Sequence, residues 1–133
     1  MATRQKPQSF PVLKRKLWKI FSEYVRRRDK GICFTCGNKK RWQDQDAGHY
    51  IARSIGGMGL FFEEKNVHCQ CTACNRFRHG NLVEYSLALR RKYGNTILEE
   101  LAYKKKKITK FTTKDLEVLM GYYKKKLDEN NFN

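Results

Sequence analysis

The sequence predicts an α+β fold, in which a zinc-stapled ββα core is flanked by an N-terminal helix and by C-terminal helices. Two observations support this. Two Cys-x-x-Cys pairs, Cys33–Cys36 and Cys71–Cys74, bracket a central stretch with short strand-like segments. On both sides of that centre, apolar residues recur at helical spacing. The cysteines would hold the small core together, and the helices would cover it.

The charge of the chain is strongly one-sided. Lys and Arg number 29 against 13 acidic residues, which gives a formal net charge of +16 over 133 residues. The excess is greater in residues 1–30 and 81–133 than in the centre. Solubility rarely needs so large a field, whereas a polyanion such as nucleic acid is attracted by it. We therefore expect a nucleic-acid partner.

We divide the chain into a flexible basic arm over residues 1–12 and a single domain over residues 13–133. Within that domain, residues 31–80 form the zinc-stapled core and residues 81–133 a helical part. No stretch approaches the ~20 apolar residues of a membrane span, and the N-terminus lacks the apolar centre of a signal peptide. We expect an intracellular protein without membrane contact, where closely spaced cysteines hold metal rather than form disulfides.

The first half of the chain predicts one helix and one short strand. An apolar stripe predicts a helix over residues 13–29, ended by Gly31. Cys33–Gly37 is typical of a zinc knuckle, and residues 47–53 suit a strand that carries His49. Glycines predict a loop over Ser54–Gly59. The stripe consists of Leu13, Leu17, Ile20, Phe21, Tyr24 and Val25.

The second half predicts one strand and several helices. Val67–Cys71 suits the second strand, and a helix is expected from Cys74. Helical spacing follows over residues 82–93 and 96–103, and the lysines at 104–107 indicate an exposed turn. Thr112 with Asp115 resembles a helix start. That last helix would place five apolar residues inward: Leu116, Leu119, Met120, Tyr123 and Leu127.

The two cysteine pairs predict a structural Zn²⁺ site. Thiolates with two residues between them can reach one tetrahedral ion, and four sulfur ligands leave no open position for a substrate. The ligands would be Cys33, Cys36, Cys71 and Cys74. Cys69 has the wrong spacing, and we expect it to be a small buried residue.

Polar residues between and after the cysteines carry a family resemblance. His49 precedes an Asn-aliphatic-x-x-x-Cys-x-x-Cys-Asn pattern that runs from Asn66 to Asn75. Over residues 33 to about 79 this resembles zinc-stapled HNH endonucleases, which have a ββα-metal core. The resemblance implies that His49 takes a proton from the attacking water, Asn66 orients the loop and Asn75 binds a catalytic Mg²⁺ or Mn²⁺.

A narrower resemblance covers most of the chain. The segments 16–24 and 47–50, together with Asn66-Val-His68, Gln70-Cys71, Cys74-Asn75 and Gly80-Asn81, are similar to the phage NinG/Rap recombination proteins. That family is associated with cleavage of Holliday junctions. The resemblance implies a branched DNA substrate, the host cytoplasm as location if the gene is phage-encoded, and a role in DNA recombination. Symmetric cutting would suit a homodimer joined through apolar faces of the terminal helices.

One position departs from the HNH pattern. Most members have an Asp or His before the catalytic histidine as a metal ligand, and here that position is Gly48. Because one Asn is too weak to hold Mg²⁺, another residue must complete the site. The candidates are His68, His79 and Asp46. With imidazole ligands, Mn²⁺ or another transition metal would be favoured.

Because Gly48 replaces the usual metal-binding residue, a second function is also compatible with the sequence. The chain would then be a non-catalytic zinc-containing protein that binds nucleic acid. A third, an RNA-directed factor, lacks the run of exposed aromatic residues that base stacking needs. In each case arginines are the expected contacts to phosphate, and the expected set is Arg26, Arg27, Arg28, Arg53, Arg76 and Arg78.

Overall fold

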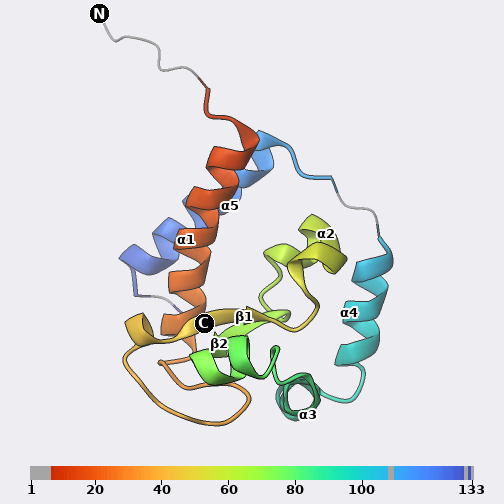
Figure 1. Cartoon of the computed structure of the whole chain (residues 1–133). Helices are drawn as coiled ribbons and strands as arrows, with labels where there is room; N and C mark the ends of the chain where they lie inside the picture. The colour runs from red at the N-terminus through yellow and green to blue at the C-terminus, as the bar shows by residue number, and fades with distance from the viewer. Residues whose placement is uncertain (1–6, 108–109, 131, 133) are drawn as a thin grey trace, which may run out of the picture.

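The computed structural model describes residues 7–107, 110–130 and 132. Five helices surround a small two-stranded sheet (Figure 1). A 3-10 turn (Trp42–Asp44) precedes the first strand, and a π-helical turn (Ala73–Phe77) follows the second. The strands are β1 (Asp46–His49) and β2 (Val67–Gln70). The helices are α1 (Phe10–Arg28), α2 (Arg53–Phe61), α3 (Leu82–Tyr93), α4 (Ile97–Lys106) and α5 (Thr113–Asp128). The predicted α+β composition is confirmed, although the fold is mostly helical.

Helix α1 begins earlier than expected. Pro11 lies in its first turn, where a helix tolerates a missing N–H, so residues 10–12 are helical and are not part of an arm. Residues 1–6 of the expected arm lie outside the described residues. The predicted apolar stripe is buried at five positions: Leu13, Leu17, Phe21, Tyr24 and Val25.

Helix α5 packs along α1 (Figure 1). Thr112 and Asp115 form the expected capping box, in which the Thr112 hydroxyl accepts from the Asp115 backbone N–H at 3.2 Å. Leu116, Met120 and Tyr123 are buried in the same cluster as the α1 stripe. The apolar faces that were expected to join two copies of the chain pack against each other within one chain, and a homodimer stays a prediction.

The two strands form an antiparallel hairpin in which Gly48 pairs with His68 and His49 with Val67. All four residues of β2 are buried. Helix α1 covers one side of the hairpin, and Tyr85 of α3 reaches it from the other. The hairpin therefore lies against α1, and Tyr85 contacts Gly48 and His68.

Residues 53–61, which connect the strands, were expected to contain a loop and instead form α2. Gly57, with φ of 65° and ψ of −173°, interrupts the helix, so the glycines bend it rather than abolish it. Leu60 and Phe61 are buried at its end. Their burial stabilises a helix that local propensity disfavours.

A second cluster lies between α2, α3 and α4 and contains Leu60, Tyr85, Leu89, Ile97 and Leu101. Three of the lysines predicted to form a turn, Lys104–Lys106, instead make the last turn of α4. Positive side chains are favoured there by the helix dipole. None of the helices in the described part of the chain has the length and apolar character that crossing a membrane requires.

Candidate functional site

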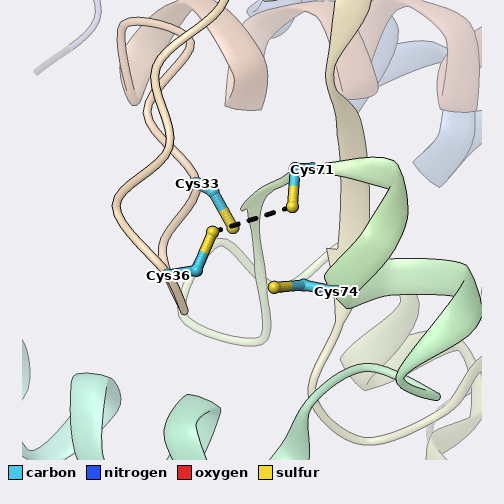
Figure 2. Close-up of side chains that lie close together, drawn as sticks. All are labelled: Cys33, Cys36, Cys71 and Cys74. Carbon is cyan, nitrogen blue, oxygen red and sulfur yellow. Dashed lines mark hydrogen bonds between the residues drawn. The ribbon is translucent and has the colours of Figure 1, made fainter.

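The four cysteines of the two pairs converge. Their sulfur atoms all lie within 4.8 Å of one another, and the Cys36 and Cys71 sulfurs are 3.7 Å apart. Figure 2 shows the sulfurs of Cys33 and Cys36 facing those of Cys71 and Cys74 across two chain segments. Such a group could hold one zinc ion with a closed shell of four ligands.

Backbone hydrogen bonds shape both halves of this cluster. The Gly37 N–H donates to the Cys33 carbonyl and the Cys33 N–H to that of Asn38, which closes a tight turn around the first pair. The Asn75 N–H donates to the Cys71 carbonyl, which starts the π-helical turn after the second pair. The four-cysteine cluster thus places Asn75 directly after one of its members, Cys74.

Cys69 takes no part in the cluster. Its side chain is buried in β2 opposite Ala47, as expected of a small apolar residue. Burial, with Asp29 and Cys33 adding to it, raises the pKa of Cys69 to about 12, so the thiol stays protonated near neutral pH.

His49 lies at the end of β1 and packs between α1 and α2. Its ring stacks on Trp18, with centroids 5.1 Å apart, and its Nε2 lies 2.9 Å from the Phe61 carbonyl oxygen. Because a carbonyl only accepts, Nε2 carries the proton and Nδ1 keeps a lone pair. Burial, with Arg53 adding to it, lowers the pKa of His49 to about 4. The ring is therefore neutral at physiological pH.

Asn66 is fully buried and ties together the ends of the segment between the strands. Its Oδ1 accepts from the Ile51 N–H at 2.9 Å, and its Nδ2 donates to the carbonyls of Ile51 and Leu60 at 3.1 and 3.0 Å. These contacts have the form expected of a residue that orients the loop after His49. Its role in catalysis stays a prediction.

Asn75 follows the last cysteine and lies against β1. Its Nδ2 donates to Asp46 Oδ2 at 3.1 Å, and the same carboxylate pairs with Arg76 at 3.2 Å. Asp46, one of the three candidates for a completing ligand, therefore lies next to Asn75.

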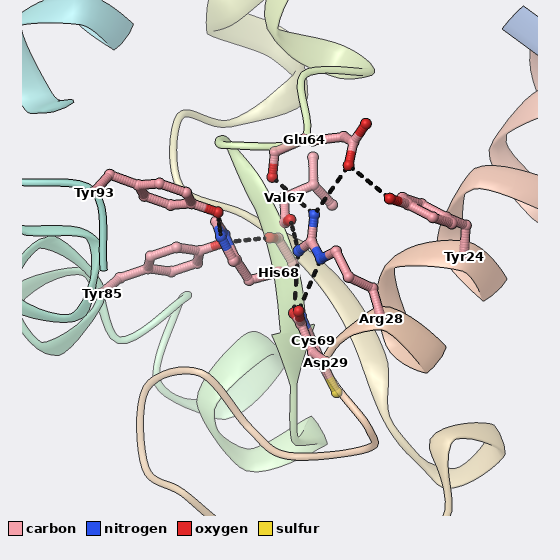
Figure 3. A network of polar contacts seen from close by, with 10 residues as sticks. Tyr24, Arg28, Asp29, Glu64, Val67, His68, Cys69, Tyr85 and Tyr93 are labelled. Atoms are coloured by element: carbon pink, nitrogen blue, oxygen red, sulfur yellow. Dashed lines mark hydrogen bonds and ion pairs between the residues drawn. The ribbon is translucent and has the colours of Figure 1, made fainter. Parts of the chain in front are cut away.

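The other two candidates have different environments. His68 is buried, with Nδ1 3.1 Å from the Tyr85 hydroxyl and Nε2 2.8 Å from the Tyr93 hydroxyl, and Phe34 stacks on its ring. Figure 3 shows both tyrosines with their hydroxyl ends directed at His68. Both ring nitrogens are occupied, so the expectation of a metal ligand is corrected to a core contact. His79 is exposed after the π-helical turn, with φ of 50°.

The expected arginine contacts divide into two groups. The Arg28 side chain is 10% exposed, pairs with Asp29 at 2.8 Å and donates to the carbonyls of Glu64 and Val67 at 3.1 and 2.9 Å (Figure 3). These contacts hold its guanidinium and join α1 to β2, so the expected phosphate contact is corrected to a structural contact. Arg26 and Arg27 are half-buried in contacts with Trp42.

Three arginines remain exposed: Arg53, Arg76 and Arg78. Arg53 lies over the rings of Trp18 and Phe61, at 5.2 and 5.8 Å, and Lys14 lies 4.4 Å from the Phe61 ring. These residues and Arg15 line a surface hollow of about 740 Å³. The sequence places Lys14 and Arg15 on the basic face of α1 but does not join them to Arg53, because nothing in the spacing indicates that α1 and α2 meet there.

The structure places the predicted catalytic residues on or beside the hairpin but does not bring them into one cluster. His49 contacts Trp18 and Phe61, Asn66 contacts the connecting segment, and Asn75 contacts Asp46. No hydrogen bond joins the three to each other within the described residues. His49 ends β1, whereas Asn75 bonds to Asp46, which starts it.

Comparison with known proteins gives a consistent result. The family model described as "Bacteriophage Lambda NinG protein" matches residues 3–131. "Protein ninG" of Salmonella phage P22 is 30% identical over 127 residues, covering 93% of this chain and 59% of that protein. "Protein ninG" of Escherichia phage lambda is 28% identical over 127 residues, with the same coverage of 93% and 59%. The chain thus spans 59% of the length of both relatives. No solved structure matches.

Proposed function

The chain belongs to the NinG family of bacteriophage proteins, and from this premise we propose that it is a metal-dependent endonuclease of the HNH type. Its substrate would be branched DNA of the kind formed in recombination, above all the Holliday junction. The four-cysteine cluster would hold the structural zinc of an HNH ββα-metal core. Two cuts across a symmetric junction would take two copies of the chain.

The observation that best supports this proposal is the environment of His49. Phosphodiester hydrolysis needs a group that takes a proton from the attacking water, and a neutral histidine can do so. The hydrogen bond to Phe61 holds the ring in the tautomer that leaves the Nδ1 lone pair for the water. The low pKa keeps the ring unprotonated, and the negative charge of a bound phosphate would raise its basicity.

The surroundings of His49 suit a phosphate. Lys14, Arg15 and Arg53 line the hollow formed with Trp18 and Phe61, the two rings that His49 contacts. Their positive charges would attract the DNA backbone and favour negative charge that develops in the transition state. Asn66 would hold the segment that carries Arg53 and Phe61 in place.

A divalent metal would supply the remaining charge. When bound, it would stabilise the leaving oxygen of the phosphodiester, and Asn75 is the residue that we propose to hold it. Its neighbour Asp46 provides the negative charge that a single amide lacks.

A second function, nucleic-acid binding without cleavage, is favoured by one observation. Gly48 occupies the position of the usual metal-binding acid, and a protein that had lost catalysis could keep the zinc cluster and the basic surface. The retained His49 contact argues for catalysis, because a pure binder has no need of an oriented histidine.

The experiment that separates the two is a titration of Mg²⁺ and Mn²⁺ with an end-labelled four-way junction. We expect metal-dependent cleavage near the branch point, and competition by unlabelled junction stronger than by linear duplex of equal length. Both should weaken steeply as salt rises, because the basic surface displaces counterions from DNA. Tight binding with no cleavage at any metal concentration would favour the non-catalytic function.

A further inference from the structure

We propose that Asp46, Gln70 and Asn75 form an oxygen site for a hard divalent cation beside Gly48. This site would replace the acid that the HNH pattern places at position 48. Its catalytic meaning rests on the proposed function, but the site itself follows from the orientation of three side chains.

The Gln70 side chain is fully buried, and its orientation is fixed. Its Nε2 donates to the Gly80 carbonyl oxygen at 2.9 Å and to the Thr35 hydroxyl at 3.2 Å. Because the carbonyl only accepts, the amide cannot be turned the other way. Oε1 therefore points away from Gly80 and finds no hydrogen-bond partner within the described part of the chain. A buried oxygen without a partner is costly, so a ligand is expected there.

The Asn75 amide is fixed in the same manner. Its Nδ2 donates to the Asp46 carboxylate, which is an acceptor when ionised, so Oδ1 faces the opposite direction. Across residues 7–107, 110–130 and 132, no hydrogen bond to this oxygen is found.

The two amide oxygens meet at Gly48. A Cβ atom at this position would collide with Gln70 Oε1 and would lie 2.8 Å from Asn75 Oδ1. Gly48 has no positive φ, so its backbone does not require glycine. The missing side chain instead leaves room in which both oxygens converge. This explains in physical terms why a glycine occupies a buried strand position.

Asp46 adds the negative charge. It lies two residues before Gly48 on β1 and opposite Gln70 in the hairpin, so these residues share one face of the sheet. Its carboxylate now pairs with Arg76, whose side chain is 68% exposed. The guanidinium could turn toward solvent or DNA when a metal ion takes its place.

One carboxylate and two amide oxygens are the ligands of a hard cation. Mg²⁺ and Mn²⁺ take oxygen donors and keep several waters, whereas the thiolates of the zinc cluster suit softer ions. The remaining positions could accept water and a phosphate oxygen. The imidazole ligands expected from the sequence are not needed.

The test measures Mn²⁺ binding by the zinc-loaded protein without DNA, from the loss of the free-ion electron paramagnetic resonance signal. The first pair of variants is Asp46→Asn against Asp44→Asn, since Asp44 is an exposed acid two residues away that pairs with Arg41. The second pair is Gly48→Ala against Gly121→Ala, since a Cβ at Gly121 meets nothing within 4 Å. Zinc content and circular dichroism verify each protein.

We expect the parent protein to bind one Mn²⁺ per chain in addition to zinc. The affinity for Mn²⁺ should be at least tenfold weaker in Asp46→Asn and Gly48→Ala. It should be unchanged in both controls. Mg²⁺ should compete. No Mn²⁺ binding by the parent protein, or equal losses in Asp46→Asn and Asp44→Asn, would overturn the site and would mean that water fills the space beside Gly48. Mn²⁺ binding in the expected pattern without junction cleavage would refute the nuclease proposal and leave the site standing.

Discussion

The Nε2 atom of His49 donates to the carbonyl oxygen of Phe61 over 2.9 Å, and this bond attaches the end of β1 to the end of α2. The neighbouring carbonyl, that of Leu60, accepts from Asn66. The last carbonyls of a helix have no partner within it. Here two of them are satisfied by the histidine and the asparagine that we propose for catalysis, so the orientation of His49 depends on how α2 is held.

Replacement of Asn66 should therefore change the orientation of His49, because the carbonyls that the two residues bind are adjacent in the chain. Asn66→Ala removes three hydrogen bonds of a fully buried side chain and should cost about 1–3 kcal/mol in the free energy of unfolding. Amide hydrogen exchange in residues 51–61 should rise more than in α5, and cleavage should fall. Equal exchange in both regions would show that Asn66 does not hold this segment.

The stability of the fold should depend on pH through its buried histidines. Burial lowers the pKa of His49 to about 4 and that of His68 well below its ordinary value of 6.5. At a pH between the folded and the unfolded pKa of a histidine, the unfolded chain therefore binds more protons than the folded chain. The free energy of unfolding should thus be complete above pH 6.5 and decrease as the pH falls toward 4, with roughly 3 kcal/mol as the upper bound for His49. Urea unfolding at pH 7 and pH 5 measures this, with His79→Asn as control. A flat profile would contradict it.

Arg28 and Arg53 should have opposite effects. Arg28→Met leaves Asp29 without its ion-pair partner, in a pair whose side chains are 10% and 8% exposed. Loss of one partner of a buried ion pair typically costs about 3–5 kcal/mol in the free energy of unfolding. The DNA affinity of the folded variant should stay the same. Arg53→Ala should leave stability within about 0.5 kcal/mol and weaken DNA binding, with a smaller salt dependence. Thermal unfolding and DNA titrations at several salt concentrations measure both. Weakened DNA binding by folded Arg28→Met would restore Arg28 as a contact.

Metal content should separate the four clustered cysteines from Cys69. Cys36→Ser removes one of the four converging sulfurs and should lower zinc content and destabilise the core, whereas Cys69→Ser should keep one zinc per chain. Metal analysis of the purified proteins decides between them. Zinc lost from the Cys69 variant and retained in the Cys36 variant would reverse the assignment.

The sequence predicted features that depend on local pattern. Spacing over a few residues predicts the apolar stripe of α1, the capping box at Thr112 and a cluster formed by the two Cys-x-x-Cys pairs. In the structure the stripe is buried, the capping box forms and the four sulfurs converge. The glycines of residues 54–59 misled the prediction, because burial of Leu60 and Phe61 outweighs their low helix propensity.

The polar core could not be predicted in the same way. Whether a histidine or arginine is buried depends on partners distant in sequence, as in the contacts of His68 with Tyr93 and of Arg28 with Glu64. Gln70 gave no signal of its own, since only the fold shows that its Oε1 lacks a partner. Asp46 could be named as a candidate, but its contact with Asn75 needed the hairpin register.

The most direct test of the account is the cleavage of a labelled four-way junction by His49→Ala, with His79→Asn as the matched control on an exposed histidine. If His49 takes the proton from water, its loss should reduce the cleavage rate by ~10²–10⁴, because general-base catalysis contributes that much. Junction affinity should stay the same, since one neutral ring adds little to a chain of net charge +16. Full cleavage by a folded, zinc-loaded His49→Ala protein would contradict the account and place the chemistry elsewhere.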